Sequence, residues 1–173
     1  MKTTDILKDL DETTHDFLKV LSAFEAEQVN IVPFEGSWTA GQVAEHVLKS
    51  EAGLPDILLG PTAHEKRASD EKVAIINSIF LDFSTKMQAP SFIIPSEGPH
   101  DQQQLLASFT KKRSQIAAVA GTEDLTLTCM SFRFPNLGEL TRVEWLSFII
   151  AHSKRHTFQL RNIFEKVTEK VES

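Results

Sequence analysis

The longest helical pattern in the sequence begins at Thr141 and runs to about Val171. Thr141 and Glu144 have the spacing of a capping box, in which each side chain bonds the backbone amide of the other residue. Apolar side chains then recur with helical spacing at Trp145, Ile149, Leu160, Ile163 and Val167. Because such a helix must bury its apolar stripe against other helices, this segment predicts a helical bundle.

Other stretches of the chain show the same periodicity. The predicted bundle helices span residues 4–28, 39–54 with a bend at Pro55 and a continuation to Leu59, and 101–121, and a shorter accessory helix spans 69–83. Capping boxes mark two of their starts, Thr39 with Gln42 and Asp101 with Gln104.

Two long connectors separate these helices. Residues 88–100 contain three of the seven prolines and predict an extended crossover, while residues 122–140 look strand-like and are long enough to form a lip over a site. The expected fold is all-α, a four-helix bundle with a long crossover and one accessory helix. The crossover disfavours a simple up-down-up-down path.

Length and composition bound the class of protein. A chain of 173 residues suits a single domain over 1–173, and no apolar run approaches the roughly 20 residues of a membrane span. The start lacks a signal-peptide pattern, so we expect a cytoplasmic protein. A net charge of −6, with no basic block longer than KKR at 111–113, argues against a nucleic-acid partner. The single cysteine, Cys129, excludes an internal disulfide and a cysteine-rich zinc site, and we expect it to be packed in its connector.

Two histidines stand out on the final helix. His152 and His156 are four residues apart and share the apolar face of Ile149. Each buried ring nitrogen without a partner costs about 1–3 kcal/mol, and a shared metal ion would satisfy one nitrogen of each ring. Ser153 stands where a metalloprotease HExxH motif needs glutamate, so the protease interpretation fails.

A third ligand must come from elsewhere, and His46 is the best candidate. It lies on the inward side of its helix beside Val43 and Val47. The remaining histidines are expected to be solvated, His15 opposite its apolar stripe and His64 and His100 in polar connectors.

On the outer side of the second helix we expect Glu45, Lys49 and Glu51. The sequence therefore predicts three histidine ligands and an open position, which is typical of catalytic sites. Zinc is favoured by ligand type, and nickel, iron or manganese is also compatible.

Other residues allow two interpretations each. Arg113 lies near an apolar stripe, where it would either bind a substrate carboxylate or be ion-paired. Phe148 and Phe158 lie on the back of the final helix, where they would either pack under the connectors or form a homodimer face, which we favour slightly.

Three segments together resemble a known family. SWTAGQVAEHVL, APSFIIP and FPNLGELTRVEWLSFIIAHSKRHTFQL are similar to the DinB/YfiT-like superfamily of small four-helix-bundle metalloproteins, over about residues 35–165. The resemblance implies a divalent metal held by His46, His152 and His156, and it also matches Trp38 and Gln159. Many relatives have His-Pro and His-Glu where this chain has Phe134-Pro135 and His152-Ser153.

The resemblance also suggests an activity. Characterised relatives include S-transferases and isomerases that use low-molecular-weight thiols such as bacillithiol or mycothiol, and others are regarded as metal-dependent hydrolases. We therefore expect a metal-dependent enzyme that activates a thiol or water against a small-molecule substrate. The alternative is a non-enzymatic helical stress-response or binding protein with a structural or vestigial metal site.

Overall fold

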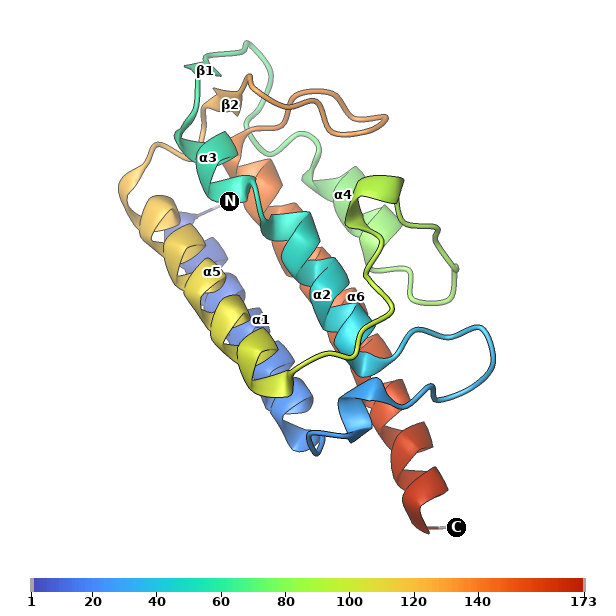
Figure 1. Ribbon diagram of the computed structural model, residues 1–173. Coiled ribbons are helices and arrows are strands. Elements are labelled where there is room, and N and C mark those ends of the chain that lie inside the picture. The colour runs from blue at the N-terminus through green and yellow to red at the C-terminus, as the bar shows by residue number, and fades with distance from the viewer. Residues whose placement is uncertain (1, 173) are drawn as a thin grey trace.

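The computed structural model describes residues 2–172, with side chains described for residues 2–169 (Figure 1). Four long helices form the bundle: α1 (Thr3–Ala23), α2 (Ala40–Glu51), α5 (Gln102–Thr122) and α6 (Arg142–Glu172). The accessory helix α4 (Val73–Phe80) packs against α6. The short elements are η1 (Gln28–Asn30), α3 (Leu54–Leu59), β1 (Thr62–Ala63), η2 (Ser91–Ile93) and β2 (Thr128–Cys129). The predicted helical-bundle fold is confirmed.

The bundle does not alternate in direction. In Figure 1, α1 and α6 run downward, whereas α2 and α5 run upward. Both α1 and α2 contact α5 and α6, so α1 and α2 lie on one diagonal of the bundle and α5 and α6 on the other. The long crossover through α4 returns the chain to the lower end of the bundle, where α5 starts parallel to α2. The predicted departure from an up-down-up-down path is confirmed.

Helix starts follow the sequence signals closely. Thr39 and Gln42 exchange both capping-box bonds, and so do Thr141 and Glu144. At α5, the Asp101 carboxylate accepts from the Gln104 amide at 3.0 Å, which is half of a capping box.

Other boundaries differ from the predictions. The first helix ends at Ala23, not at 28, and α4 starts at Val73, not at 69. The strand-like connector 122–140 contains one short strand, β2, which pairs antiparallel with β1 in the register Thr62↔Cys129.

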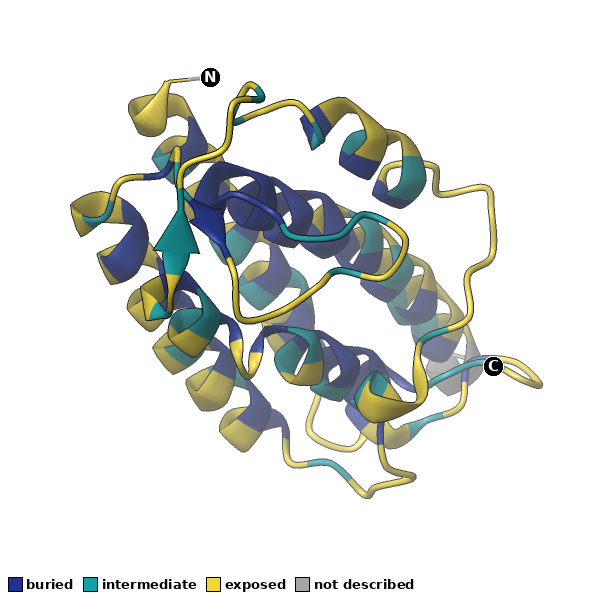
Figure 2. Ribbon diagram, turned by 90° about the horizontal axis from the view of Figure 1, so that it is seen from above, coloured by how far each residue is buried: buried dark blue, intermediate teal, exposed yellow. Residues whose placement is uncertain are grey.

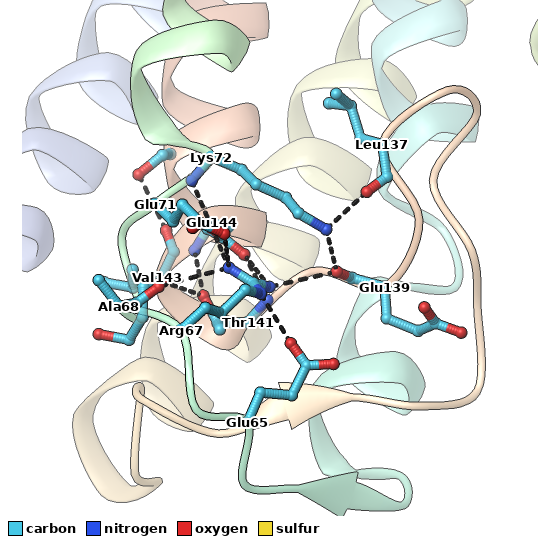
Figure 3. Close-up of polar contacts among 12 residues, drawn as sticks. Glu65, Arg67, Ala68, Glu71, Lys72, Leu137, Glu139, Thr141, Val143 and Glu144 are labelled. Carbon is cyan, nitrogen blue, oxygen red and sulfur yellow. Dashed lines mark hydrogen bonds and ion pairs between the residues drawn. The ribbon is translucent and has the colours of Figure 1, made fainter.

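The start of α6 is held by a buried carboxylate (Figure 3). Glu144 is fully buried and accepts two bonds of 2.8 Å from the Arg67 guanidinium, one of 2.7 Å from the Lys72 amide and one of 2.9 Å from the Thr141 amide. Although burial raises the pKa of Glu144, these hydrogen bonds lower it below its usual range. The α4 helix starts late because the residues before it bond α6: the Ser69 carbonyl accepts from the Thr141 hydroxyl at 2.6 Å.

The buried interior consists of two apolar clusters with polar side chains between them, and Figure 2 shows buried residues along the inward faces of the helices. Towards the connectors, α1 and α5 contribute Leu10 and Ile116, and towards the other end they contribute Phe17 and Phe109. Each bundle helix places buried polar residues between the clusters, namely Thr13, His46, Glu51, Arg113, His152, Ser153, His156 and Thr157. This buried polar layer contains the three predicted metal ligands.

The two phenylalanines on the back of α6 do not share one exposed face. Phe148 is only 7% exposed, and its ring lies 4.9 Å from the rings of Phe80 in α4 and Phe134 in the connector. Phe158 is 41% exposed and stacks on Phe83 at 4.9 Å. A dimer contact through Phe148 is therefore wrong, because α4 and the connector cover it, and the homodimer stays a prediction.

Among the described helices, none combines the length and the apolar character that crossing a membrane requires.

Candidate metal centre

The three predicted ligands meet inside the bundle. His46 of α2 faces His152 and His156 of α6, and their Nε2 atoms form a triangle with sides of 3.1, 3.1 and 3.2 Å. The three residues are 4%, 4% and 7% exposed, respectively. The helical phase that placed His152 and His156 on the face of Ile149 is therefore confirmed.

Aromatic rings enclose the triangle. The Trp38 ring lies 5.1 Å from that of His46, just before α2 begins. On the other side, Phe148 and Phe80 lie 5.1 and 5.9 Å from the His152 ring. These contacts fix the imidazole planes and exclude water from the sides of the cluster.

Hydrogen bonds at the outer nitrogens set the tautomers of two rings. The Nδ1 atom of His46 lies 2.9 Å from the Ile93 carbonyl oxygen, which can only accept, so this nitrogen carries the proton. His156 Nδ1 lies 2.7 Å from Gln159 Oε1, and with the amide oxygen facing the ring this nitrogen is also a donor. Both Nε2 atoms therefore direct lone pairs at each other, 3.1 Å apart, and neither can donate.

The His152 ring cannot donate a hydrogen bond to both of these lone pairs. His152 could donate from Nε2 to one of the two facing nitrogens, but not to both. Its Nδ1 atom is buried and has no hydrogen-bond partner among the described residues. Protein hydrogen bonds therefore leave at least one Nε2 lone pair of the cluster unsatisfied.

The histidines are neutral at physiological pH. Burial lowers the pKa of His46, although the bond to Ile93 opposes this shift. Burial also lowers the pKa of His156 to about 3, and it lowers that of His152 well below its usual value, with neighbouring positive charges adding to the effect. Neutral imidazole is the form that binds metal ions.

A divalent cation fits this donor set. Tetrahedral zinc with Zn–N bonds of about 2.0–2.1 Å separates its nitrogen ligands by about 3.3 Å, close to the sides of the Nε2 triangle. Three convergent lone pairs would be satisfied at once. Among the described residues, no carboxylate or thiolate completes the group, so a bound ion would keep an open position. Three imidazoles alone do not select between zinc, nickel, iron and manganese.

Arg113 lies in the same polar layer, but it is already paired. It is 2% exposed, and its Nε and Nη2 atoms lie 2.6 and 2.9 Å from the carboxylate oxygens of Glu51. Arg113 also donates to the hydroxyls of Thr14 and Ser153 and lies over the Phe109 ring. Of the two interpretations of Arg113, the structure favours the ion-paired one over a substrate-binding role.

Glu51 is the residue that the sequence analysis missed. It was expected on the outer side of α2, but it is 1% exposed, so that expectation is wrong. The available signal was its spacing, because Glu51 follows Val47 by four residues on the inward stripe. Its charge is compatible with burial because Arg113 binds both carboxylate oxygens.

The remaining candidates fall outside the cluster. His15 and His64 are exposed, as predicted. His100 was expected to be solvated, and this is wrong, since its ring packs on Gly41 and its Nε2 atom lies 3.3 Å from Glu45. Cys129 is buried in the connector, as expected, and burial raises the pKa of its thiol to about 11, which leaves it unreactive.

Comparisons with known proteins show the family of the chain. The chain is 26% identical over 152 residues to the uncharacterized protein YuaE of Bacillus subtilis (strain 168). The aligned region covers 85% of this chain and 90% of YuaE. No solved structure matches significantly. The sequence model of the DinB superfamily matches residues 9–160, a span that contains all three histidines and most of the bundle. The chain therefore belongs to the DinB superfamily.

Proposed function

We propose that this protein is a metal-dependent enzyme that uses His46, His152 and His156 to activate a thiol or a water molecule against a small-molecule substrate. The observation that carries the proposal is the convergence of three neutral Nε2 atoms with too few donors to satisfy them. A thiol S-transferase and a hydrolase are the two reaction classes that such a site suits.

The chemistry divides between the ion and the chain. A divalent ion held by three imidazoles would lower the pKa of a coordinated thiol or water toward neutrality and so supply a nucleophile. The chain's own residues keep the ligands ready: Ile93 and Gln159 hold the Nδ1 protons of His46 and His156. The aromatic rings around His152 limit access of bulk water. We propose zinc as the ion and a low-molecular-weight thiol as a co-substrate of the transferase.

One observation supports a second candidate. The histidines are at most 7% exposed, which also suits a structural or vestigial metal site in a non-enzymatic binding or stress-response protein. The two candidates share the metal site and differ in whether substrate reaches it.

An activity assay separates these candidates. Zinc-loaded protein is incubated with 1-chloro-2,4-dinitrobenzene and a panel of glutathione, cysteine, bacillithiol and mycothiol, and in parallel with a chromogenic ester. In transfer, the thiol sulfur forms a bond to carbon and chloride leaves. The controls are His156→Gln, which removes a ligand, and His15→Ala, which changes an exposed histidine.

We expect adduct formation or ester hydrolysis that His156→Gln loses and His15→Ala keeps. Adduct formation favours the transferase, and hydrolysis without thiol consumption favours the hydrolase. Absence of both reactions in stoichiometrically loaded protein would contradict the enzyme proposal for these substrates and favour the structural site.

A further inference from the structure

One face of α2 binds the backbone of the crossover that leads to α5. Lys49 donates from Nζ to the Ile94 carbonyl at 2.8 Å, and Gln42 donates from Nε2 to the Ser96 carbonyl at 3.2 Å. Between them on the same helix face, His46 bonds the Ile93 carbonyl. The side of α2 with Glu45 and Lys49, which the sequence places in solvent, therefore lies against the crossover.

Glu45 makes the largest number of these contacts. Its carboxylate accepts a short hydrogen bond from the Ser96 amide and one of 3.0 Å from the Ser96 hydroxyl. The His100 ring lies against the same carboxylate, with Nε2 at 3.3 Å. Glu45, which directly precedes His46 in α2, therefore binds the crossover at two points four residues apart, Ser96 and His100.

The far end of the crossover is fixed as well. Asn30 exchanges two hydrogen bonds with the backbone of His100, at 2.7 and 2.9 Å. The His100 ring packs so closely on α2 that a Cβ atom at Gly41 would lie 2.7 Å from the His100 Cβ. The crossover is thus bound to its neighbours at both Ile93 and His100.

This anchoring bears directly on the metal ligand. A neutral imidazole carries its proton on either nitrogen, and only the Nδ1–H form leaves Nε2 free for a metal. The Ile93 carbonyl selects that form of His46, and it does so only while the crossover stays on α2. We propose that Glu45 is a positioning residue of the metal centre, which fixes the tautomer of His46 by holding the crossover against α2. This role rests on the proposed metal-binding function.

Two substitutions of Glu45 separate the effect of its hydrogen bonds from the effect of its charge. Glu45→Ala removes the acceptors for Ser96 and His100, whereas Glu45→Gln removes the charge but keeps one oxygen for the Ser96 amide. Glu97→Ala is the matched control, because Glu97 is an exposed glutamate of the same crossover that makes no hydrogen bond among the described residues. Lys49→Ala, which releases the neighbouring Ile94 carbonyl, is a second variant if Glu45→Ala folds poorly.

Three readouts test the role. Long-range ¹⁵N–¹H NMR correlation reports the His46 tautomer in metal-free protein, hydrogen exchange reports the Ser96 amide, and competition with a chelator gives the zinc affinity. In Glu45→Ala we expect a detectable Nε2–H population at His46, at least tenfold faster Ser96 exchange and zinc affinity lower by about 10–100-fold. Glu45→Gln should lie between Glu45→Ala and wild type, and Glu97→Ala should match wild type.

Two results would overturn the role of Glu45. One is a Glu45→Ala protein, or Lys49→Ala if the former is unfolded, in which His46 stays fully in the Nδ1–H form. The other is an equal loss of zinc affinity in Glu45→Gln and Glu45→Ala with unchanged tautomers, which would assign the effect to charge. If wild type binds no zinc, the proposed function fails, but the tautomer measurement still decides the role of Glu45.

Discussion

Glu51 and Arg113 face each other inside the bundle and form a two-pronged ion pair, with contacts of 2.6 and 2.9 Å. The pair joins α2 to α5, and the bond from Arg113 to Ser153 extends it to α6, beside His152. The metal ligands and this ion pair therefore occupy one buried polar layer, which a further bond from Arg113 to Thr14 of α1 connects to all four bundle helices.

Breaking the pair from one side should be costly. Either Glu51→Leu or Arg113→Met leaves a buried charge without its partner, so we expect each to lower the free energy of unfolding by about 3–5 kcal/mol. The double variant should cost much less than the sum, because no unpaired charge remains. Urea denaturation of the four proteins in a double-mutant cycle checks this, and additive losses would contradict a direct coupling.

The buried histidines should make the metal-free protein sensitive to acid. Their pKa values are lower in the folded state, for His156 about 3, so below about pH 6.5 the unfolded chain binds protons that the folded chain does not. The free energy of unfolding should fall as pH drops from about 6.5 towards 4, by up to about 1.4 kcal/mol per pH unit for each histidine.

Urea titrations between pH 4 and 7 measure this slope, and His156→Gln should reduce it by about one proton. His15→Gln, which replaces an exposed histidine, is the control variant. Equal slopes in wild type and His156→Gln would show that His156 is not buried in its neutral form.

Gln159 should matter for metal affinity without touching the metal. Its Oε1 atom lies 2.7 Å from His156 Nδ1 and accepts the proton of that nitrogen, so Gln159→Ala frees the ring to change tautomer. We expect zinc affinity to fall by about 10–100-fold. Gln103→Ala, on the exposed side of α5, should leave the affinity unchanged. Competition with a chelator measures the zinc affinity of both variants. An affinity of Gln159→Ala equal to that of Gln103→Ala would contradict the tautomer mechanism.

Substitution of two helical glycines by alanine should affect the free energy of unfolding differently. At Gly121 nothing lies within 4 Å of a Cβ atom, so Gly121→Ala should raise the free energy of unfolding by up to about 1 kcal/mol through helix propensity. At Gly41 the new Cβ would meet the His100 side chain at 2.7 and 2.8 Å. Gly41→Ala should therefore lose this gain and displace His100, seen as faster exchange of the Ser96 amide. Equal stabilisation by both changes would argue against a tight contact.

The sequence predicted what local patterns encode. Capping signals at Thr39 and Thr141 are satisfied within four residues, so they mark helix starts without tertiary information. The helical phase likewise placed His46, His152 and His156 on inward faces.

The environments of Glu51 and Glu45 could not be predicted from local patterns, because they depend on residues far away in the sequence. Glu51 is buried because Arg113 binds it, and Glu45 covers the crossover because Ser96 and His100 fold back onto α2. These contacts join residues about 50 to 60 positions apart. A single sequence read by periodicity places charged residues in solvent, and only the tertiary fold shows the exceptions.

We expect the three histidines to bind one divalent metal ion, and metal analysis of the purified protein measures this binding without any assumption about activity. Purified protein is loaded with zinc, dialysed and analysed by mass spectrometry of the elements, together with His152→Ala and His15→Ala. We predict about one equivalent of metal per chain in wild type and in His15→Ala, and loss of that metal in His152→Ala. A wild-type protein that retains no stoichiometric metal, or a His152→Ala protein that keeps it, would show that these histidines do not form a metal site.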